Sequence, residues 1–147
     1  MALSLCWSLN SHAISPPEGD DAIPDADLTP GILCTDQDEN FEEYYYDEQI
    51  ARCKRSVGKK EKEQVAEAYG GIAQSDWHNY EFDHLIPLCA GGSDDIGNIW
   101  PEPITQAKKK DKVEVEVCDA MANNTMTQKQ AVARVMSFFQ DLKSGKK

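Results

Sequence analysis

This chain of 147 residues lacks several common features. It has no apolar run long enough to cross a membrane, which excludes a membrane span. No two of its five cysteines form a Cys-x-x-Cys pair, which argues against a zinc knuckle. It contains no internal repeat and no separate DNA-reading motif such as a helix-turn-helix. With only three histidines, His12, His78 and His84, the candidates for a general base are few.

Basic residues are absent before Arg52, and charge is therefore divided unevenly along the chain. Residues 1–48 hold twelve of the 26 acidic residues and none of the 15 basic ones, so residues 49–147 carry 14 acidic against 15 basic residues. The formal net charge of −11 opposes nucleic-acid binding, which depends on neutralising phosphates. Because residues 49–147 are nearly neutral, the negative charge opposes nucleic-acid binding only in the N-terminal part.

Residues 1–13 are interpreted as the end of a secretory signal peptide. An apolar run there ends in Ser11-His12-Ala13, a small-x-small pattern typical of a cleavage site. The positively charged start of such peptides is missing, and a loosely packed N-terminus is the alternative. Residues 14–29 are rich in proline and acid and are predicted to be a flexible linker. Residues 30–147 are predicted to form the folded domain.

Four cysteines remain when residues 1–13 are set aside, and an even number in an exported chain predicts disulfides. Three pairings are possible, and we favour Cys34 with Cys53 and Cys89 with Cys118. The first pair would tie the start of the domain to its first helix, and the second would tie a hairpin to the helix after it. Each would contribute about 3 kcal/mol by the chain-entropy estimate. Four buried free thiols are the alternative, which a cytoplasmic location would favour.

The stretch from Glu81 to Pro103 carries the candidate chemistry. Its apolar run from Phe82 to Leu88 predicts a strand, and residues 91–95 are a strong turn signal. Residues 98–100 resume an extended segment, and a periodic segment follows from about Thr105. The pattern therefore predicts a strand, a loop and a returning strand.

The order of residues in this stretch resembles the HNH endonucleases, most of all their small bacterial members. The matching positions are Asp83-His84, Gly91-Gly92-Ser93, Asn98-Ile99-Trp100-Pro101, Lys110-Asp111 and Glu114. The likeness covers about residues 30–120. It implies an α+β fold, mostly helical, in which a ββα-metal (HNH) hairpin-plus-helix core is framed by additional helices. It also implies metal-dependent hydrolysis of phosphodiester bonds in DNA with low sequence specificity, and RNA stays open as a substrate.

The resemblance also assigns roles, since phosphodiester hydrolysis needs a base to activate water and a cation to neutralise the phosphate. His84 would be the general base and Asp83 a metal ligand. Asn98 would hold the loop and the base in place through hydrogen bonds. The histidine or asparagine ligand that the family has on the following helix is missing, and Gln106 is nominated in its place. Such a site suits Mg²⁺, with Mn²⁺ or Zn²⁺ as alternatives.

Basic residues around this stretch are candidates for contacts with phosphate groups. They are Arg55, Lys108, Lys109, Lys110 and Lys112. An ordinary solvated helix face is the alternative. The acidic residues 14–48 could also lie over the basic face formed by residues 108–112 and compete with DNA for it.

A second class of function stays open. The missing ligand and the acidic N-terminal part would also suit a catalytically degenerate HNH-like protein-interaction module. The presence of Asp83, His84 and Asn98 together favours the nuclease. Export predicts a periplasmic or secreted bacterial protein, and the sequence does not indicate an oligomeric state.

The remaining segments are predicted to be mainly helical. Tyr44–Val57 has apolar residues three and four apart, and a second helix is predicted over Lys59–Tyr69 before a glycine pair. Residues 113–117 alternate like a strand, but the resemblance implies one helix from about Thr105 to Ala122. Residues 127–130 form a capping-box pattern at the start of a final helix.

Overall fold

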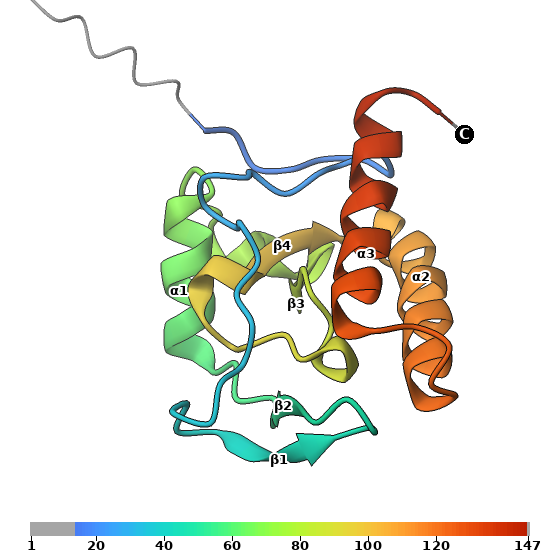
Figure 1. Cartoon of the computed structure of the whole chain (residues 1–147). Coiled ribbons are helices and arrows are strands. Elements are labelled where there is room, and N and C mark those ends of the chain that lie inside the picture. The colour runs from blue at the N-terminus through green and yellow to red at the C-terminus, as the bar shows by residue number, and fades with distance from the viewer. Residues whose placement is uncertain (1–13, 147) are drawn as a thin grey trace, which may run out of the picture.

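The structure is a computed structural model that describes residues 14–146 (Figure 1). Its strands and helices are β1 (Phe41–Tyr45), β2 (Ile50–Cys53), α1 (Lys59–Ala68), β3 (Tyr80–His84), β4 (Ile99–Pro103), α2 (Ile104–Ala122) and α3 (Gln128–Lys143). Three short 3-10 helices are η1 (Gln74–Asn79), η2 (Leu88–Ala90) and η3 (Ile96–Asn98). The chain is a small α+β fold with two antiparallel sheets, which confirms the predicted class. The predicted signal peptide, residues 1–13, lies outside the described residues.

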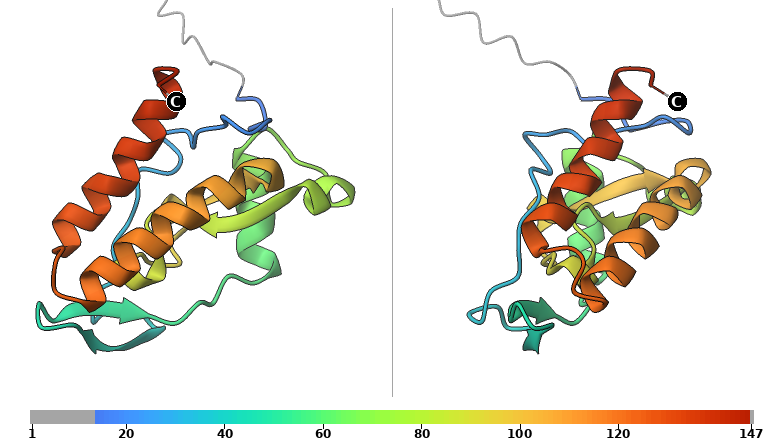
Figure 2. Two further views of the ribbon diagram at one scale, coloured as in Figure 1. Left: turned by 90° about the vertical axis from the view of Figure 1, so that its right-hand side faces the viewer. Right: turned by 45° about the vertical axis from the view of Figure 1, so that its right-hand side comes forward.

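The hairpin of β3 and β4 lies at the centre of the molecule. Its strands pair antiparallel, with Tyr80 opposite Pro103 and His84 opposite Ile99. Helix α1 lies on one side of this hairpin, and α2 and α3 lie on the other (Figures 1 and 2). Trp100 of β4 is fully buried and meets Phe139 of α3 edge to face at 5.6 Å. Burial of these apolar faces holds the three helices against the hairpin.

Strand β4 contains two prolines, Pro101 and Pro103, which a central strand of a larger sheet would not accept. They are tolerated because the sheet has two strands, so that β4 is an edge strand. All five residues of β4 are buried. The helices on both sides therefore cover this edge.

The helix predicted over Tyr44–Val57 is wrong, because this segment forms the hairpin of β1 and β2. The chain reverses between Tyr46 and Gln49, whose φ angles of 61° and 59° are left-handed. Aromatic and β-branched residues such as Tyr44, Tyr45 and Ile50 favour strands, and this preference prevails over the helical spacing. The hairpin lies at one end of the molecule (Figure 1).

The other predicted helices are confirmed. The alternating residues 113–117 lie inside α2, where Val113 and Val117 are buried one turn apart and Val115 is 61% exposed. Helix α3 begins with the predicted capping box, in which the hydroxyl of Thr127 accepts from the main-chain N–H of Gln130 at 3.3 Å. None of the helices within residues 14–146 combines the length and apolar character needed to cross a membrane.

Two disulfides lie within residues 14–146, and their pairing is the one that we favoured. Cys34 is bonded to Cys53, which lies in β2 and not in a helix. Cys89 of η2 is bonded to Cys118 of α2. Structural disulfides of this kind are typical of oxidising, extracellular-type compartments.

Residues 14–29, predicted to be a flexible linker, lie across the end of the molecule opposite the β1–β2 hairpin (Figure 1). Ala22 and Thr29 are buried, and the hydroxyl groups of Thr29 and Tyr69 are 2.6 Å apart. The ammonium of Lys109 donates to the carboxylates of Asp20 and Asp21 at 3.0 and 3.1 Å. This segment therefore has specific contacts with the domain.

Candidate functional site

His84, the last residue of β3, is only 2% exposed and is held through both ring nitrogens. Its Nε2 lies 2.6 Å from Oδ1 of Asp94, and its Nδ1 lies 3.1 Å from Nη1 of Arg55. A guanidinium can only donate, so Nδ1 of the neutral ring must accept. The ring proton is then on Nε2, and the Asp94 carboxylate accepts a hydrogen bond from this N–H group. The two contacts fix both the orientation and the tautomer of the ring.

Asp94 is fixed in turn by two other segments of the chain. Its Oδ2 accepts from the side-chain amide of Asn40 at 2.7 Å and from the main-chain N–H of Ser56. Asn40 also donates to the carbonyl of Lys54 at 2.7 Å, which ties these two segments together. A histidine that is held by a fixed carboxylate on one nitrogen is suited to act as a general base through the other.

Asn98 braces the loop that connects β3 to β4. Its Nδ2 donates to the carbonyls of Ile86 and Ser93 at 3.0 and 2.9 Å, and its Oδ1 accepts from the N–H of Ile86 at 2.9 Å. Gly92 makes this possible, because a Cβ there would lie 1.8 Å from the Ile86 carbonyl oxygen. These bonds match the bracing role that the resemblance implies for Asn98, and they hold the loop that carries Asp94.

Asp83 lies beside Nδ1 of the histidine ring, next to Arg55. Its Oδ1 is 3.6 Å from Nδ1 of His84, too long for a hydrogen bond, and 3.2 Å from Nη1 of Arg55. Its Oδ2 accepts from the ammonium of Lys110 at 2.7 Å. Burial acts to raise the pKa of Asp83, but the charge and hydrogen bond of Lys110 and the main-chain N–H of His84 hold the pKa well below its usual range. Asp83 is therefore ionised at neutral pH.

Lys110 of α2 is 1% exposed and lies among three carboxylates. Besides Asp83 it contacts Glu114, one helical turn further on, and Oε2 of Glu102 at 3.7 Å. Burial acts to lower the pKa of Lys110, but these carboxylates hold it above its usual value. Burial raises the pKa of Glu102 to about 8, only partly offset by the charge of Lys110. Oε1 of Glu102 has no hydrogen-bond partner among the described residues.

The other residues predicted for the site are distributed differently from what we expected. Lys110 was predicted to contact phosphates, but its side chain is buried and enclosed by the carboxylates. Lys108 and Lys112 are exposed, and Lys109 is paired with the N-terminal segment. Gln106, the nominated metal ligand, is fully buried, and its amide has no hydrogen-bond partner within residues 14–146.

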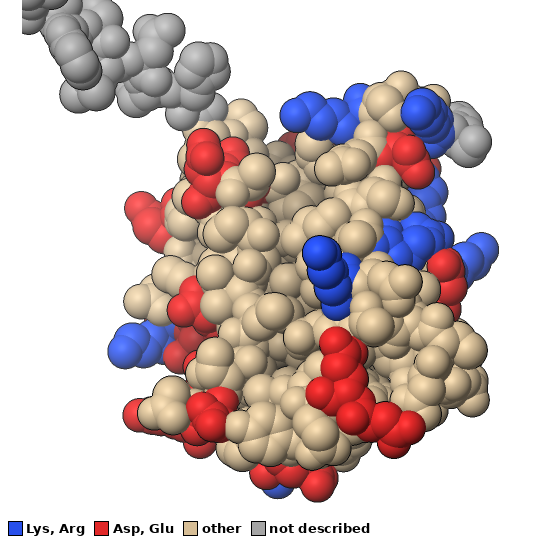
Figure 3. Space-filling model, viewed as in Figure 1, with Lys and Arg blue, Asp and Glu red and all other residues tan. Residues whose placement is uncertain are grey.

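Charge is also divided over the surface. Acidic side chains gather over the β1–β2 end of the molecule, and basic ones lie along the side of α2 and α3 (Figure 3). Arg55 belongs to neither group, since it lies at the site with 47% of its side chain exposed. The surface beside His84 therefore carries a half-exposed positive charge, which contacts Asp83, His84 and the carbonyl of Phe82.

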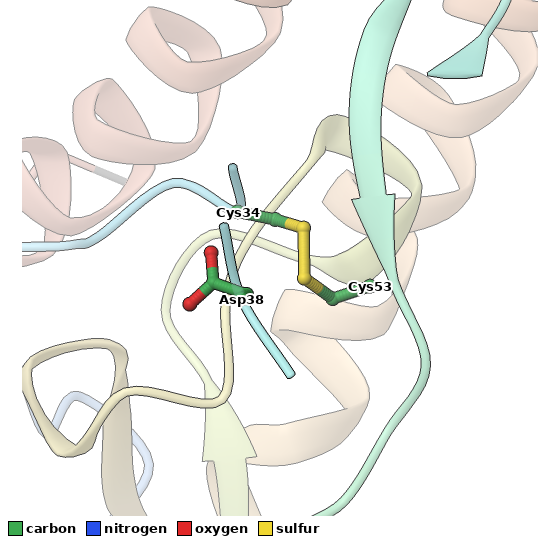
Figure 4. Close-up of side chains that lie close together, drawn as sticks. All are labelled: Cys34, Asp38 and Cys53. Carbon is green, nitrogen blue, oxygen red and sulfur yellow. A yellow bond between two sulfur atoms is a disulfide. The ribbon is translucent and has the colours of Figure 1, made fainter. Parts of the chain in front are cut away.

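A second group of metal-binding type is formed by Cys34, Asp38 and Cys53. One sulfur or carboxylate atom from each lies within 4.8 Å of the others, so the group could hold a metal ion on distance alone. The two sulfurs are bonded to each other, however (Figure 4). Metal binding by cysteine requires thiolates, so the disulfide form does not offer this donor set.

The sequence did not indicate several residues of the site. Asp94 was read only as part of a turn, although it lies ten residues after His84 in the loop that returns to β4. Glu102 and its contact with Lys110 were also missed, because nothing in their spacing shows that β4 and α2 face each other. A pair of acidic residues in a loop after a candidate base is the signal that would have identified Asp94.

Comparisons of the chain with protein-family models, with curated proteins and with solved structures found no match. The chemistry of the site therefore has to be argued from the contacts of the described residues.

Proposed function

We propose that this protein is a metal-dependent endonuclease of the HNH type, which hydrolyses phosphodiester bonds of DNA with low sequence specificity. One observation carries the proposal. The ring of His84 is held by Asp94 at 2.6 Å on Nε2, and its other nitrogen lies beside the ionised carboxylate of Asp83. The order of β3, β4 and α2, with Asn98 bracing the loop, supports an assignment to the ββα-metal group.

In this proposal His84 is the general base. A water molecule at Nδ1 loses a proton to the ring as its oxygen attacks the phosphorus atom. The bond between phosphorus and the 3′ oxygen breaks, and the leaving oxygen takes up a proton from solvent water. Asp94 stabilises the imidazolium that forms, because its negative carboxylate already accepts a hydrogen bond from Nε2–H. A general base of this kind contributes about 10²- to 10⁴-fold to the rate.

Arg55 has to move for this step, since its Nη1 occupies the position beside Nδ1. Its side chain is 47% exposed, and a phosphate offers a guanidinium two charge-assisted hydrogen bonds. Binding of the substrate would thus draw Arg55 to the phosphate and open Nδ1 to water. Arg55 is in this way both a phosphate ligand and a cover for the base.

Asp83 is the residue that would hold a divalent cation. It fits this role because it is ionised and 21% exposed, and Mg²⁺ binds through one or two carboxylates together with phosphate oxygens and water. When bound, the cation would supply the positive charge that neutralises the phosphate. Oxygen donors favour Mg²⁺ or Mn²⁺ over Zn²⁺. Gln106 does not fit as a second ligand, because its amide is fully enclosed.

The proposal is tested by incubating supercoiled plasmid with the protein in Mg²⁺, in Mn²⁺ and in EDTA. We expect nicking in the presence of either ion and none in EDTA. Intact plasmid under all three conditions, with the protein folded by circular dichroism, would contradict it.

A second candidate is an HNH-like interaction module without activity. It is favoured by the closure of the site, because Asp83 is held by both Arg55 and Lys110 and His84 is 2% exposed. A module of this kind would leave plasmid intact in both metals. The same incubation therefore separates the two candidates.

We also infer that the protein is exported to the periplasm or secreted, because its two disulfides suit an oxidising compartment. Thiol labelling of protein from its native compartment is expected to modify none of Cys34, Cys53, Cys89 and Cys118. Four reactive thiols would contradict export.

A further inference from the structure

A cleft of about 430 Å³ opens beside the candidate site. It is lined by Arg55, Lys62, Trp77, Tyr80, Glu81, Phe82 and Asp83. These residues come from four segments, namely the loop after β2, helix α1, η1 and strand β3. The cleft thus reaches the carboxylate that would hold the cation, and its volume lies within the range of small-ligand pockets.

The lining combines two cations with three aromatic side chains and two carboxylates. Arg55 and Lys62 are able to bind phosphate, since both carry charge and neither is buried. Trp77 is held in position: its ring meets Phe82 edge to face at 5.0 Å, and its Nε1 donates to the carbonyl of Ile72 at 3.3 Å. A fixed aromatic ring next to cations is what recognises a nucleobase attached to a phosphate.

We infer that this cleft binds one nucleotide of a single-stranded nucleic acid, with the base stacked on Trp77 or Tyr80 and its phosphate on Arg55 and Lys62. The inference rests on the proposed nuclease function and deepens it, because it names single-stranded substrate. The strand would run from the cleft to Asp83 and place the next phosphate beside His84.

The charge of the chain also favours a single strand over a duplex. Binding to a duplex depends on many phosphate contacts, whereas residues 49–147 carry 14 acidic against 15 basic residues. Stacking on an aromatic ring adds affinity that does not depend on net charge. Bases within a duplex are stacked on one another and cannot reach Trp77. Glu81 repels phosphate from its part of the cleft, and as a hydrogen-bond acceptor it suits the amino groups of a base.

The test measures binding and not cleavage, so that it is independent of activity. Fluorescence anisotropy would compare a fluorescein-labelled octanucleotide of DNA with its duplex, in EDTA and at low salt. The single strand is expected to bind at least tenfold more tightly. Equal affinity for both forms, or tighter binding of the duplex, would overturn the inference.

Two substitutions locate the binding. Trp77→Leu keeps an apolar side chain against Phe82 and is expected to weaken single-strand binding about 5- to 150-fold, the range for stacking on one ring. Lys62→Ala is expected to weaken it several-fold and to lower the salt dependence by about 0.7 in log–log slope. Lys59→Ala, on the same helix with a 67% exposed side chain, is the matched control and should change neither quantity.

The Lys62 and Lys59 variants keep the test decisive if Trp77→Leu does not fold. If Lys62→Ala and Lys59→Ala changed single-strand affinity by the same factor, the inference would be overturned. Single-strand binding in a protein that cuts neither plasmid nor the labelled single strand in Mg²⁺ would support the cleft and contradict the nuclease. Cleavage of duplex by a protein without single-strand preference would support the nuclease and contradict the cleft.

Discussion

The contacts on the two ring nitrogens of His84 decide which of them is available for chemistry. Asp94 accepts a hydrogen bond from Nε2–H, which leaves Nδ1 without a proton. Nδ1 is the nitrogen that faces Asp83. This assignment depends on Asp94 being fixed, which the amide of Asn40 and the N–H of Ser56 provide. An ordinary buried histidine needs no such support from three segments of chain.

Asp94→Ala is expected to lower kcat by about 10²-fold or more with little change in KM, because it removes the group that orients the base and no group that binds substrate. Asp94→Asn keeps an acceptor for the Nε2 proton and should lose less. Nitrogen NMR of the labelled histidines gives a second readout. We expect the Nε2–H tautomer of His84 in the wild type and a mixture in Asp94→Ala.

Asp95→Ala is the control for this pair, since the Asp95 carboxylate accepts from the N–H of Gly97 at 2.7 Å and does not touch the ring. Loss of activity of the same size in Asp95→Ala and Asp94→Ala would contradict the role of Asp94. So would an unchanged tautomer in Asp94→Ala.

Strand β4 and helix α2 meet through the buried contact of Glu102 with Lys110. Glu102 is expected to make stability depend on pH. Its pKa is raised from 4.5 to about 8 on folding, so between these values the native state binds a proton that the unfolded state does not. Stability therefore falls as pH rises from about 5 to 8, by up to about 1.4 kcal/mol per pH unit.

Glu102→Gln removes this titration, so its melting temperature should fall less than that of the wild type between pH 5 and pH 8. Differential scanning calorimetry at several pH values measures this. Glu67→Gln is the control, because Glu67 of α1 is exposed and is not among the charges that act on Glu102. Parallel curves for the wild type and Glu102→Gln would contradict the assignment.

The disulfide between Cys34 and Cys53 ends β2 immediately before Arg55 and Ser56, which contact the site. Replacing both cysteines with serine is expected to reduce stability by about 3 kcal/mol and also to reduce activity several-fold. Loss of the disulfide between Cys89 and Cys118 should reduce stability by a similar amount. Chemical denaturation and cleavage at a temperature where all variants are folded measure both effects.

The second disulfide serves as the comparison for the first. It anchors the loop that carries Asp94, but Asn98 also braces this loop through hydrogen bonds, so its loss should reduce activity less. A larger loss of activity on removing the Cys89–Cys118 bond than on removing the Cys34–Cys53 bond would contradict the role of β2 in positioning Arg55.

Helices with strong local determinants could be predicted from the sequence. The capping box at Thr127 and the glycines after Tyr69 mark the ends of α3 and α1, and the structure confirms both helices. The segment around Tyr44 was misread because apolar residues three and four apart also occur in a hairpin of aromatic strands. The pairing of β1 with β2 determines the structure of this segment, and the spacing of its residues does not reveal that pairing.

The site could be predicted only where its residues lie close in sequence. Asp83, His84 and Asn98 belong to one motif, whereas Arg55 meets His84 from 29 residues away. Lys110 was expected at the surface because it stands in a run of lysines. It is buried because it lies one turn from Glu114 on the face of α2 that meets Asp83.

Two acidic residues of the N-terminal segment lie against helix α2. Asp20 and Asp21 contact Lys109 of α2, as expected if this segment competes with nucleic acid for the basic face. These pairs are exposed, and such pairs contribute about 0.2 to 1 kcal/mol. Their effect on binding should therefore be small and should fade with salt.

Replacing both Asp20 and Asp21 with asparagine is expected to raise affinity for DNA about two- to fivefold at low salt and to have no effect at high salt, where charges are screened beyond about 8 to 10 Å. Anisotropy titrations at several salt concentrations measure this. The control replaces Asp25 and Asp27, which belong to a local turn. An effect that persists at high salt would contradict competition.

The most direct test of the account is cleavage of DNA in Mg²⁺ by the wild type, by His84→Ala and by His78→Ala. His78 is exposed, and its Nδ1 lies 2.7 Å from the carbonyl of Ser75, away from Asp83. With all three proteins folded to the same melting temperature, we expect His84→Ala to cut about 10²- to 10⁴-fold more slowly than the wild type and His78→Ala to match the wild type. Cleavage by His84→Ala at the wild-type rate would remove His84 from the mechanism and contradict the account.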